Sequence, residues 1–189
     1  PPAFMLNLEA RCRILGVAFR GGCMHDKTLL MALYKRLTDG AIDLDKFYQL
    51  VARVVVDALG GSRASVWLFQ GTLRDCLLCQ SMYDKTSAQW SAGALMHEDD
   101  CGDYFCALLD AKLIAAGDAH RDERTMCLDR LELTPAVSYS LLDVLIEVNG
   151  AAAGMVRCER DGESSWSADD EVFLKQVGAM LGLVLQKRS

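Results

Sequence analysis

The residues of this chain that could carry out chemistry are cysteine, histidine and acidic side chains, several of them in its middle third. There are eight cysteines, at positions 12, 23, 76, 79, 101, 106, 127 and 158. The first residues do not resemble a secretory signal, so we expect reduced thiols in a cytoplasmic protein, packed as small apolar groups. Cys76 and Cys79 form a C-x-x-C, but residues three apart in a strand point to opposite faces. Packing is therefore favoured over a zinc or redox site for this pair.

Three further cysteines, Cys101, Cys106 and Cys127, lie in the polar segment 84–135. Thiol redox catalysis requires a thiol with a depressed pKa and a resolving cysteine nearby. The acidic residues around Cys101, in DDCGDYF, should raise the pKa of its thiol instead. We therefore predict no catalytic residues and no enzymatic activity for this chain.

Two histidines, His97 and His120, are candidate ligands of a metal ion or of haem iron. His97 precedes Glu98, Asp99 and Asp100, and such a cluster could hold a divalent cation. A solvated acidic loop is the commoner use of such a run. We predict no metal site.

The elements that position these residues follow from hydrophobic periodicity and turn signals. Asn149-Gly150 between two apolar runs indicates a tight hairpin, because a type I′ turn needs positive φ at both central residues. Ser167 and Asp170 form a capping box at the start of the last helix. The predicted helices span 26–37, 43–59 and 168–187, and the predicted strands span 64–69, 73–83, 113–116, 136–148 and 151–159.

This order of elements predicts an α+β fold with a mainly antiparallel central sheet of about five to six strands. The long N- and C-terminal helices should lie together on one face, and the irregular segment 84–135, with two short helices, should cover the other. Residues 1–42 are expected to form an N-terminal helical extension, and residues 43–189 the main domain. Apolar residues within 5–19 repeat at coiled-coil spacing, so the extension can serve as a linker or in dimerisation.

Composition limits the partners of the chain. The formal net charge is -6 and no basic cluster stands out, so we predict no nucleic-acid partner and no attraction to anionic membranes. No apolar run approaches the roughly 20 residues that a membrane-spanning helix needs.

Three stretches of sequence together resemble one family: SVWLFQGTLRDCLLCQSMY, YFCALLDAKLIAAGDAHRDERT and VSYSLLDVLIEVNGAAAGMVRCERDGESSWSADDEVF. They are similar to motifs of GAF domains, small-molecule-binding sensor modules with a GAF/PAS-like fold, over roughly residues 43–187. Leu145 stands where members often carry Pro, a change that a strand accommodates. The resemblance implies a regulatory domain of a bacterial signal-transduction protein, working as a homodimer. Its terminal helices would pass the signal to an output domain outside this chain, such as a kinase or a cyclic-di-nucleotide enzyme.

The resemblance also implies a ligand pocket between the sheet and the middle segment, for a small molecule that the sequence does not identify. Arg124 would suit a carboxylate or a phosphate. An alternative is that Asp118 and Arg124 pair with each other or cap short helices. Asp143 should lie with Tyr139 on the strand face opposite the serines, and a buried carboxylate there needs a donor nearby. The candidate site residues are Trp90, Tyr104, Phe105, Asp118, Arg124, Thr125, Ser138 and Ser140.

Several cofactors of related domains are not supported by the sequence. No cysteine is followed by histidine, as is typical of bilin-attaching GAF domains, and the Asn-Lys-x-x-x-Phe-Asp-Glu motif of cyclic-nucleotide-binding members is missing. We predict no haem, bilin or cyclic nucleotide. Two alternatives remain: a thiol enzyme similar to the free methionine-R-sulfoxide reductases, whose Gly-rich surroundings between the cysteines this chain lacks, and a dimerisation module without a ligand.

Overall fold

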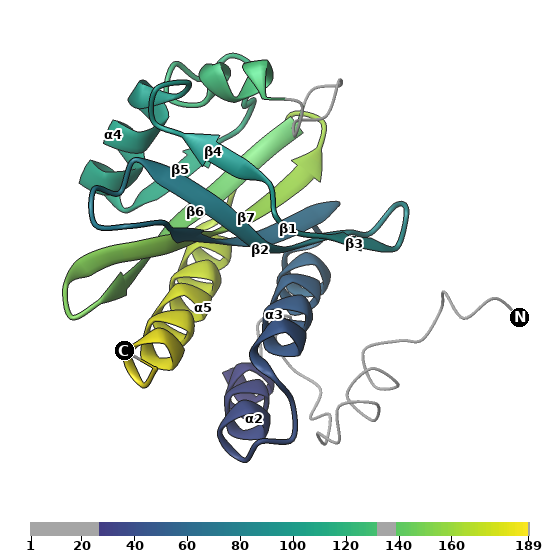
Figure 1. The fold of residues 1–189 in the computed structure, drawn as a ribbon. Helices are drawn as coiled ribbons and strands as arrows, with labels where there is room; N and C mark the ends of the chain where they lie inside the picture. The colour runs from purple at the N-terminus through teal and green to yellow at the C-terminus, as the bar shows by residue number, and fades with distance from the viewer. Residues whose placement is uncertain (1–26, 132–138, 189) are drawn as a thin grey trace, which may run out of the picture.

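A seven-stranded sheet forms the centre of the protein in the computed structural model, which describes residues 27–131 and 139–188. The strands follow the order β3-β2-β1-β7-β6-β5, and β4 also pairs with β2. All these pairings are antiparallel. Figure 1 shows the long helices on one face of the sheet and a segment of short helices and loops on the other. The predicted α+β fold and the placement of its layers are confirmed.

The strands show where the sequence prediction was incomplete. Two short strands, β3 and β4, arise within the polar segment and extend the edge of β2, so the sheet has seven strands rather than five or six. Each is three residues long, too short for a periodicity signal. The bounds are β1 Arg63–Phe69, β2 Cys76–Asp84, β3 Gln89–Ser91, β4 Leu95–His97, β5 Leu113–Ala116, β6 Tyr139–Val148 and β7 Ala151–Asp161.

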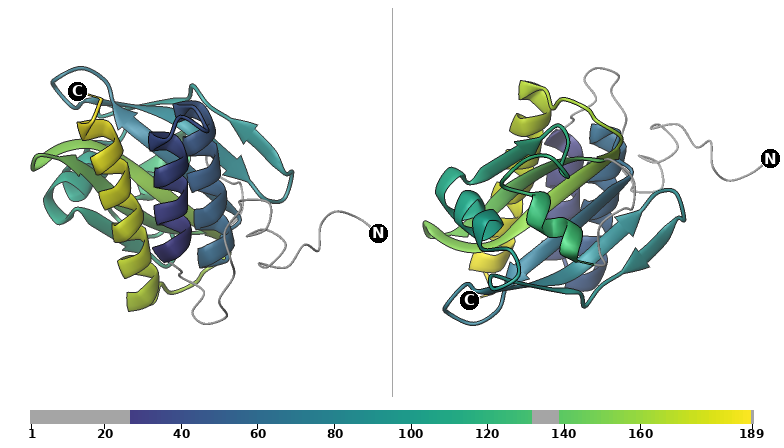
Figure 2. Two further views of the ribbon diagram at one scale, coloured as in Figure 1. Left: turned by 90° about the horizontal axis from the view of Figure 1, so that it is seen from below. Right: turned by 90° about the horizontal axis from the view of Figure 1, so that it is seen from above.

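The helical layer consists of α2 (Lys27–Thr38), α3 (Leu44–Leu59) and α5 (Ala168–Gln186). Helices α3 and α5 pack on the sheet, and α2 packs on both of them from the side away from the sheet (Figure 1 and Figure 2). The predicted ends hold: Asp43 caps α3 by accepting from the Lys46 N–H at 2.7 Å, and Gly60 ends it with φ 64°. The predicted capping box of Ser167 and Asp170 starts α5. The predicted coiled-coil spacing in 5–19 and the predicted helix start at Asp26 lie outside the described residues.

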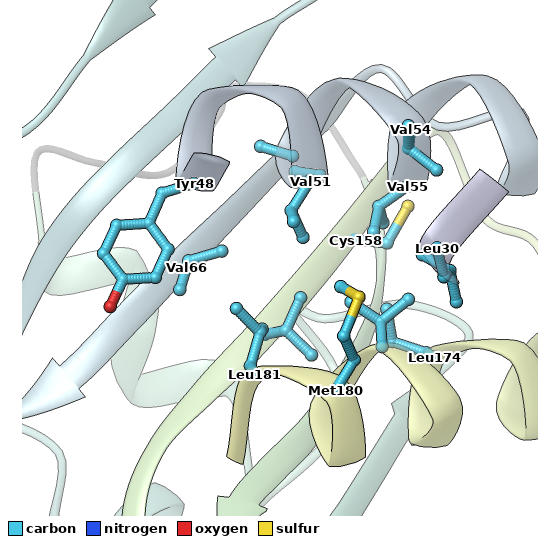
Figure 3. Packing of buried hydrophobic residues seen from close by; sticks show 14 of the residues in the cluster. Leu30, Tyr48, Val51, Val54, Val55, Val66, Cys158, Leu174, Met180 and Leu181 are labelled. Carbon is cyan, nitrogen blue, oxygen red and sulfur yellow. The ribbon is translucent and has the colours of Figure 1, made fainter. Parts of the chain in front are cut away.

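The main hydrophobic core lies between this helical layer and the sheet. Figure 3 shows Val51 and Val55 of α3 facing Leu174 and Leu181 of α5, with Val66 of β1 in the same cluster. All five side chains have almost no exposed surface. Burying a side chain of this size contributes roughly 1.5–3 kcal/mol, so this core holds the helices to the sheet.

Two glycines bring α5 unusually close to strand β6. A Cβ on Gly182 would lie far inside van der Waals contact with the carbonyl oxygen of Glu147. A Cβ on Gly178 would lie 3.2 Å from Val144 Cγ1 and 3.4 Å from the Leu145 oxygen. The helix therefore rests directly on the backbone of β6.

Replacing Gly182 with alanine tests this close contact. Alanine favours a helix by about 1 kcal/mol over glycine, but the clash with Glu147 should outweigh that gain and lower the free energy of unfolding by about 1–3 kcal/mol. Urea denaturation measures the change. Gly102→Ala is the control, because a Cβ there meets nothing within 4 Å. A Gly182→Ala protein as stable as the wild type would contradict the packing described.

Candidate ligand-binding site

Three charged side chains are buried on the face of the sheet opposite the helical layer. Asp143 of β6 is 0% exposed, and Arg157 and Glu159 of β7 are each 4% exposed. They share this face because side chains alternate along a strand, with their neighbours Leu142 and Val156 in the helix-side core. The site is thus a polar cluster within an otherwise apolar layer.

Asp143 and Arg157 form a bidentate ion pair across neighbouring strands. Arg157 donates from Nε to Asp143 Oδ1 at 2.9 Å and from Nη2 to Asp143 Oδ2 at 2.8 Å. Tyr104 joins them from the overlying helix: its hydroxyl donates to Asp143 Oδ2 at 2.5 Å and accepts from Arg157 Nη2 at 3.0 Å. The sequence-based prediction that Asp143 needs a nearby donor is confirmed.

A second ion pair lies at the edge of the first. Arg63 of β1 donates from Nε to Glu159 Oε2 at 2.6 Å, and Glu159 Oε1 lies 4.0 Å from Arg157 Nη1. Two guanidinium groups thus face two carboxylates. This balance allows three of the charged groups to be buried beside the partly buried Arg63, since an unpaired buried charge costs several kcal/mol.

The surroundings fix the protonation states of this cluster. Burial lowers the pKa of Arg157, but Asp143, Tyr104 and Glu159 together more than offset the effect of burial, so the pKa lies well above its ordinary value. Burial, and then the charge of Asp143, raise the pKa of the Tyr104 hydroxyl well above its ordinary value. Tyr104 therefore remains a hydrogen-bond donor to the carboxylate.

Helix α4 (Gly102–Ala111) covers this cluster and is itself tied to β6. It turns Tyr104, Phe105 and Leu108 toward the sheet, at helical spacing. It ends at Lys112, in the left-handed region with φ 60°, whose carbonyl accepts from the Leu145 N–H at 2.9 Å. The 3₁₀ helix η2 (Met126–Arg130) lies on the same side and places Leu128 in the same apolar layer.

Three predicted site residues lie on this face with their side chains buried. Tyr104 and Phe105 reach the sheet from α4, and Thr125 lies at the start of η2. The Thr125 hydroxyl donates to the Ala119 carbonyl at 2.8 Å. Only Tyr104 touches the charged cluster directly among these three.

Asp118 and Arg124 are held by local bonds in the loop after β5. Asp118 accepts from the His120 N–H at 3.1 Å and lies 3.4 Å from Arg121 Nε. Arg124 pairs with Asp122, donating from Nε at 2.9 Å and from Nη2 at 2.6 Å. The pairing of Asp118 with Arg124, considered from the sequence, is wrong, because each finds a partner closer along the chain.

Two other predicted residues lie on the opposite face. Trp90 of β3 stacks on Tyr83 with ring centroids 4.4 Å apart, against the helix-side core. Ser140 alternates with the cluster residues of β6 and is buried on the helix side. The structure therefore does not bring them together with Tyr104. Ser138 lies outside the described residues.

Sequence reasoning did not select Tyr139, the first described residue of β6. Its ring is buried beside His120, with centroids 5.1 Å apart, and its hydroxyl has no hydrogen-bond partner among the described residues. His120 Nδ1 lies 2.5 Å from Asp129 Oδ1. A buried hydroxyl without a partner is costly, so Tyr139 has a hydrogen-bonding capacity that no described residue meets. Strand alternation from Asp143 was the signal that could have found it.

The thiol of Cys101 is held in its neutral form by its surroundings. Cys101 is fully buried, and Cys127 lies close enough to influence its thiol. Burial, followed by Cys127, raises the pKa of Cys101 to about 12. Cys106, on α4, is exposed.

Across residues 27–131 and 139–188, no group of three or more His, Cys, Asp or Glu side chains is arranged to hold a metal ion. No helix in these ranges is long and apolar enough to cross a membrane.

The fold and this site define a class of protein: a small α+β domain with terminal helices on one face of an antiparallel sheet and a short-helix segment over the other. The family model of the GAF domain matches residues 43–185, and the chain belongs to that family. No curated protein matches it.

Solved GAF domains share the fold at low sequence identity. The GAF domain of an Acinetobacter phosphoenolpyruvate-protein phosphotransferase has a TM-score of 0.65 and 15% identity, over 84% of this chain and 91% of that chain. The phycocyanobilin-bound GAF domain of a cyanobacterial phytochrome has a TM-score of 0.65 and 13% identity, over 84% of this chain and 94% of that chain. The free methionine-R-sulfoxide reductase of Neisseria meningitidis, in complex with its substrate, has a TM-score of 0.60 and 14% identity, over 86% of this chain and 90% of that chain.

Thiol alkylation tests the state of Cys101. With a pKa of about 12, only about one Cys101 thiol in 10⁴ is ionised near pH 8, so iodoacetamide should modify the exposed Cys106 far faster. The rate at Cys101 should rise about tenfold per pH unit while the fold persists. Peptide mass spectrometry follows each site, and Cys106→Ser is the control that removes the fast reaction. Equal rates at Cys101 and Cys106 near pH 8 would contradict this account.

Proposed function

We propose that this GAF domain is a regulatory sensor of a bacterial, cytoplasmic signal-transduction protein. It binds a small molecule on the α4 side of the sheet, beside Tyr139 and the Asp143–Arg157 pair. Its terminal helices pass the signal to an output domain outside this chain, such as a kinase or a cyclic-di-nucleotide enzyme. Two structures of this fold support ligand binding, one holding phycocyanobilin and one its substrate.

The observation that carries the proposal is the position of β6 between the two faces. One side of the strand carries Tyr139 and Asp143, and the other side carries Val144 against α5. Gly182 leaves no space between α5 and the β6 backbone. Close-packed layers move as units, so a shift of β6 toward a ligand would displace α5.

Arg160 supports a joint response of the helices. From β7 it donates to the Leu59 carbonyl at the end of α3, at 3.0 and 2.7 Å, and to Asp170 Oδ2 at the start of α5, at 3.1 Å. Its guanidinium also lies 3.9 Å from the centroid of the Trp166 ring. One side chain therefore joins the end of one long helix to the start of the other.

The size of the response is set by differential affinity. A ligand can shift the equilibrium between two helix arrangements by no more than the difference between its binding free energies for them. Such coupling free energies are typically about 1–3 kcal/mol. The alternative of a thiol reductase rests on the shared fold and on the contact of Cys101 with Cys127. The raised pKa and full burial of Cys101 favour a sensor without enzymatic activity.

A metabolite screen by thermal denaturation tests ligand binding. A ligand at 100 times its Kd should stabilise the wild type by about 2.7 kcal/mol and raise its Tm. Tyr139→Phe should bind that compound at least about tenfold more weakly, because a hydrogen bond to the buried hydroxyl is lost. Hydrogen exchange in α5 should slow on binding.

Tyr48→Phe is the matched control for this screen. Tyr48 is also buried with an unpartnered hydroxyl, but it belongs to the core between the helices and the sheet. The proposal predicts that Tyr48→Phe keeps the ligand affinity of the wild type. If no compound raises the Tm and native mass spectrometry finds no retained small molecule, the chain is a dimerisation module without a ligand.

We propose that the domain dimerises through its helical layer. Three large apolar side chains there are exposed: Met31 of α2 by 64%, and Val172 and Leu183 of α5 by 51% and 54%. Leu183→Glu should convert a wild-type dimer to a monomer in sedimentation experiments, because it places a charge in the apolar interface. Leu95→Glu is the control on the distant strand β4, where Leu95 is 49% exposed. A monomeric wild type at high concentration would exclude this dimer.

A further inference from the structure

An open cavity lies at the end of the sheet, away from α4. It has a volume of about 520 Å³, within the range of small-molecule sites. Figure 1 shows that the β1–β2 loop, the β6–β7 hairpin and the end of α5 meet at this end of the molecule. Leu68 near the end of β1, Val148 at the end of β6 and Leu185 near the end of α5 supply apolar walls.

Two arginines give this cavity its charge. Arg74, in the β1–β2 loop, is anchored by donation from Nε to the Ala152 carbonyl of β7 at 3.1 Å. Arg188 reaches the cavity from beyond the last turn of α5. Within residues 27–131 and 139–188, neither forms an ion pair. Among these residues Arg36 of α2 forms none either, whereas ion pairs are formed by Arg53, Arg63, Arg121, Arg124, Arg157 and Arg160.

Unneutralised arginines beside apolar walls indicate an anion that has an apolar body. The carbonyl end of α5 lies nearby and disfavours an anion, but a helix end is equivalent to only about half a charge. Two guanidinium groups outweigh it. Inorganic phosphate would meet the arginines and leave the walls of Leu68 and Leu185 unused.

We propose that this cavity binds a small organic carboxylate with a short apolar body. Arg74 and Arg188 hold the carboxylate, and Leu68, Val148 and Leu185 contact the apolar part. The site is separate from the face under α4 and is occupied independently of the sensor ligand. A bound carboxylate would join the β1–β2 loop to the last turn of α5 and so steady the end of that helix.

Titration with hexanoate, followed by amide NMR shifts of the whole chain, tests the proposal. Hexanoate should give saturable shifts at Gly71, Thr72 and the β6–β7 hairpin. Hexanamide has the same apolar body without the charge and should bind at least about tenfold more weakly, since charge-assisted bonds to arginine are lost. Inorganic phosphate should also bind more weakly than hexanoate, because it leaves the apolar walls unused. Equal affinity for hexanoate and hexanamide, or shifts confined to other regions, would overturn the proposal.

Substitutions then locate the carboxylate. Arg188→Gln and Arg74→Gln should each weaken hexanoate binding at least about fivefold, since each removes one charged donor. Arg121→Gln is the control, because Arg121 has a side chain 82% exposed and lies in the loop after β5. If Arg74→Gln does not fold, Arg188→Gln decides the matter. Wild-type affinity in Arg188→Gln would overturn the proposal, whereas the Tyr139-dependent stabilisation should persist in every variant.

Discussion

The buried pair of Asp143 and Arg157 constrains the rest of the structure. Removing one partner of such a pair leaves a buried charge and typically costs about 3–5 kcal/mol, whereas replacing both with apolar groups is often neutral. The pair therefore contributes little net stability but permits few arrangements of the elements around it. It requires β6 and β7 to keep their alignment and α4 to place the Tyr104 hydroxyl within reach of both partners.

The alignment of β6 with β7 depends on one extra residue. Next to the Asn149-Gly150 turn, Glu147 faces Ala152, but Ile146 faces Gly154, so Ala153 has no partner across the ladder. Without this bulge Asp143 would face Val156 instead of Arg157. Position 154 also requires glycine, because a Cβ there would clash with the Trp67 carbonyl of β1. The hairpin thus sets the register on which the polar cluster depends.

Local signals in the sequence predicted the helices and their ends, because a cap such as Asp43 or Ser167 acts within one helical turn. Strand alternation predicted that Asp143 is buried and needs a donor, but the bulge that supplies Arg157 shifts the register by one residue and leaves no clear mark in the sequence. Trp90 was assigned to the wrong face because its strand is three residues long. The binding role of the selected residues remains a prediction.

The two faces of the sheet differ in a way that suits β6 to carry a signal. Apolar packing against α5 is close and non-directional, so it transmits displacement without favouring a particular trigger. The polar face has directional bonds whose geometry a ligand can change, since Tyr104 shares its hydroxyl between Asp143 and Arg157. A ligand that hydrogen-bonds to this cluster can change the strengths of these bonds at a low cost in free energy, because all the groups are already desolvated. The polar face can thus respond to a ligand while the apolar face carries the movement to α5.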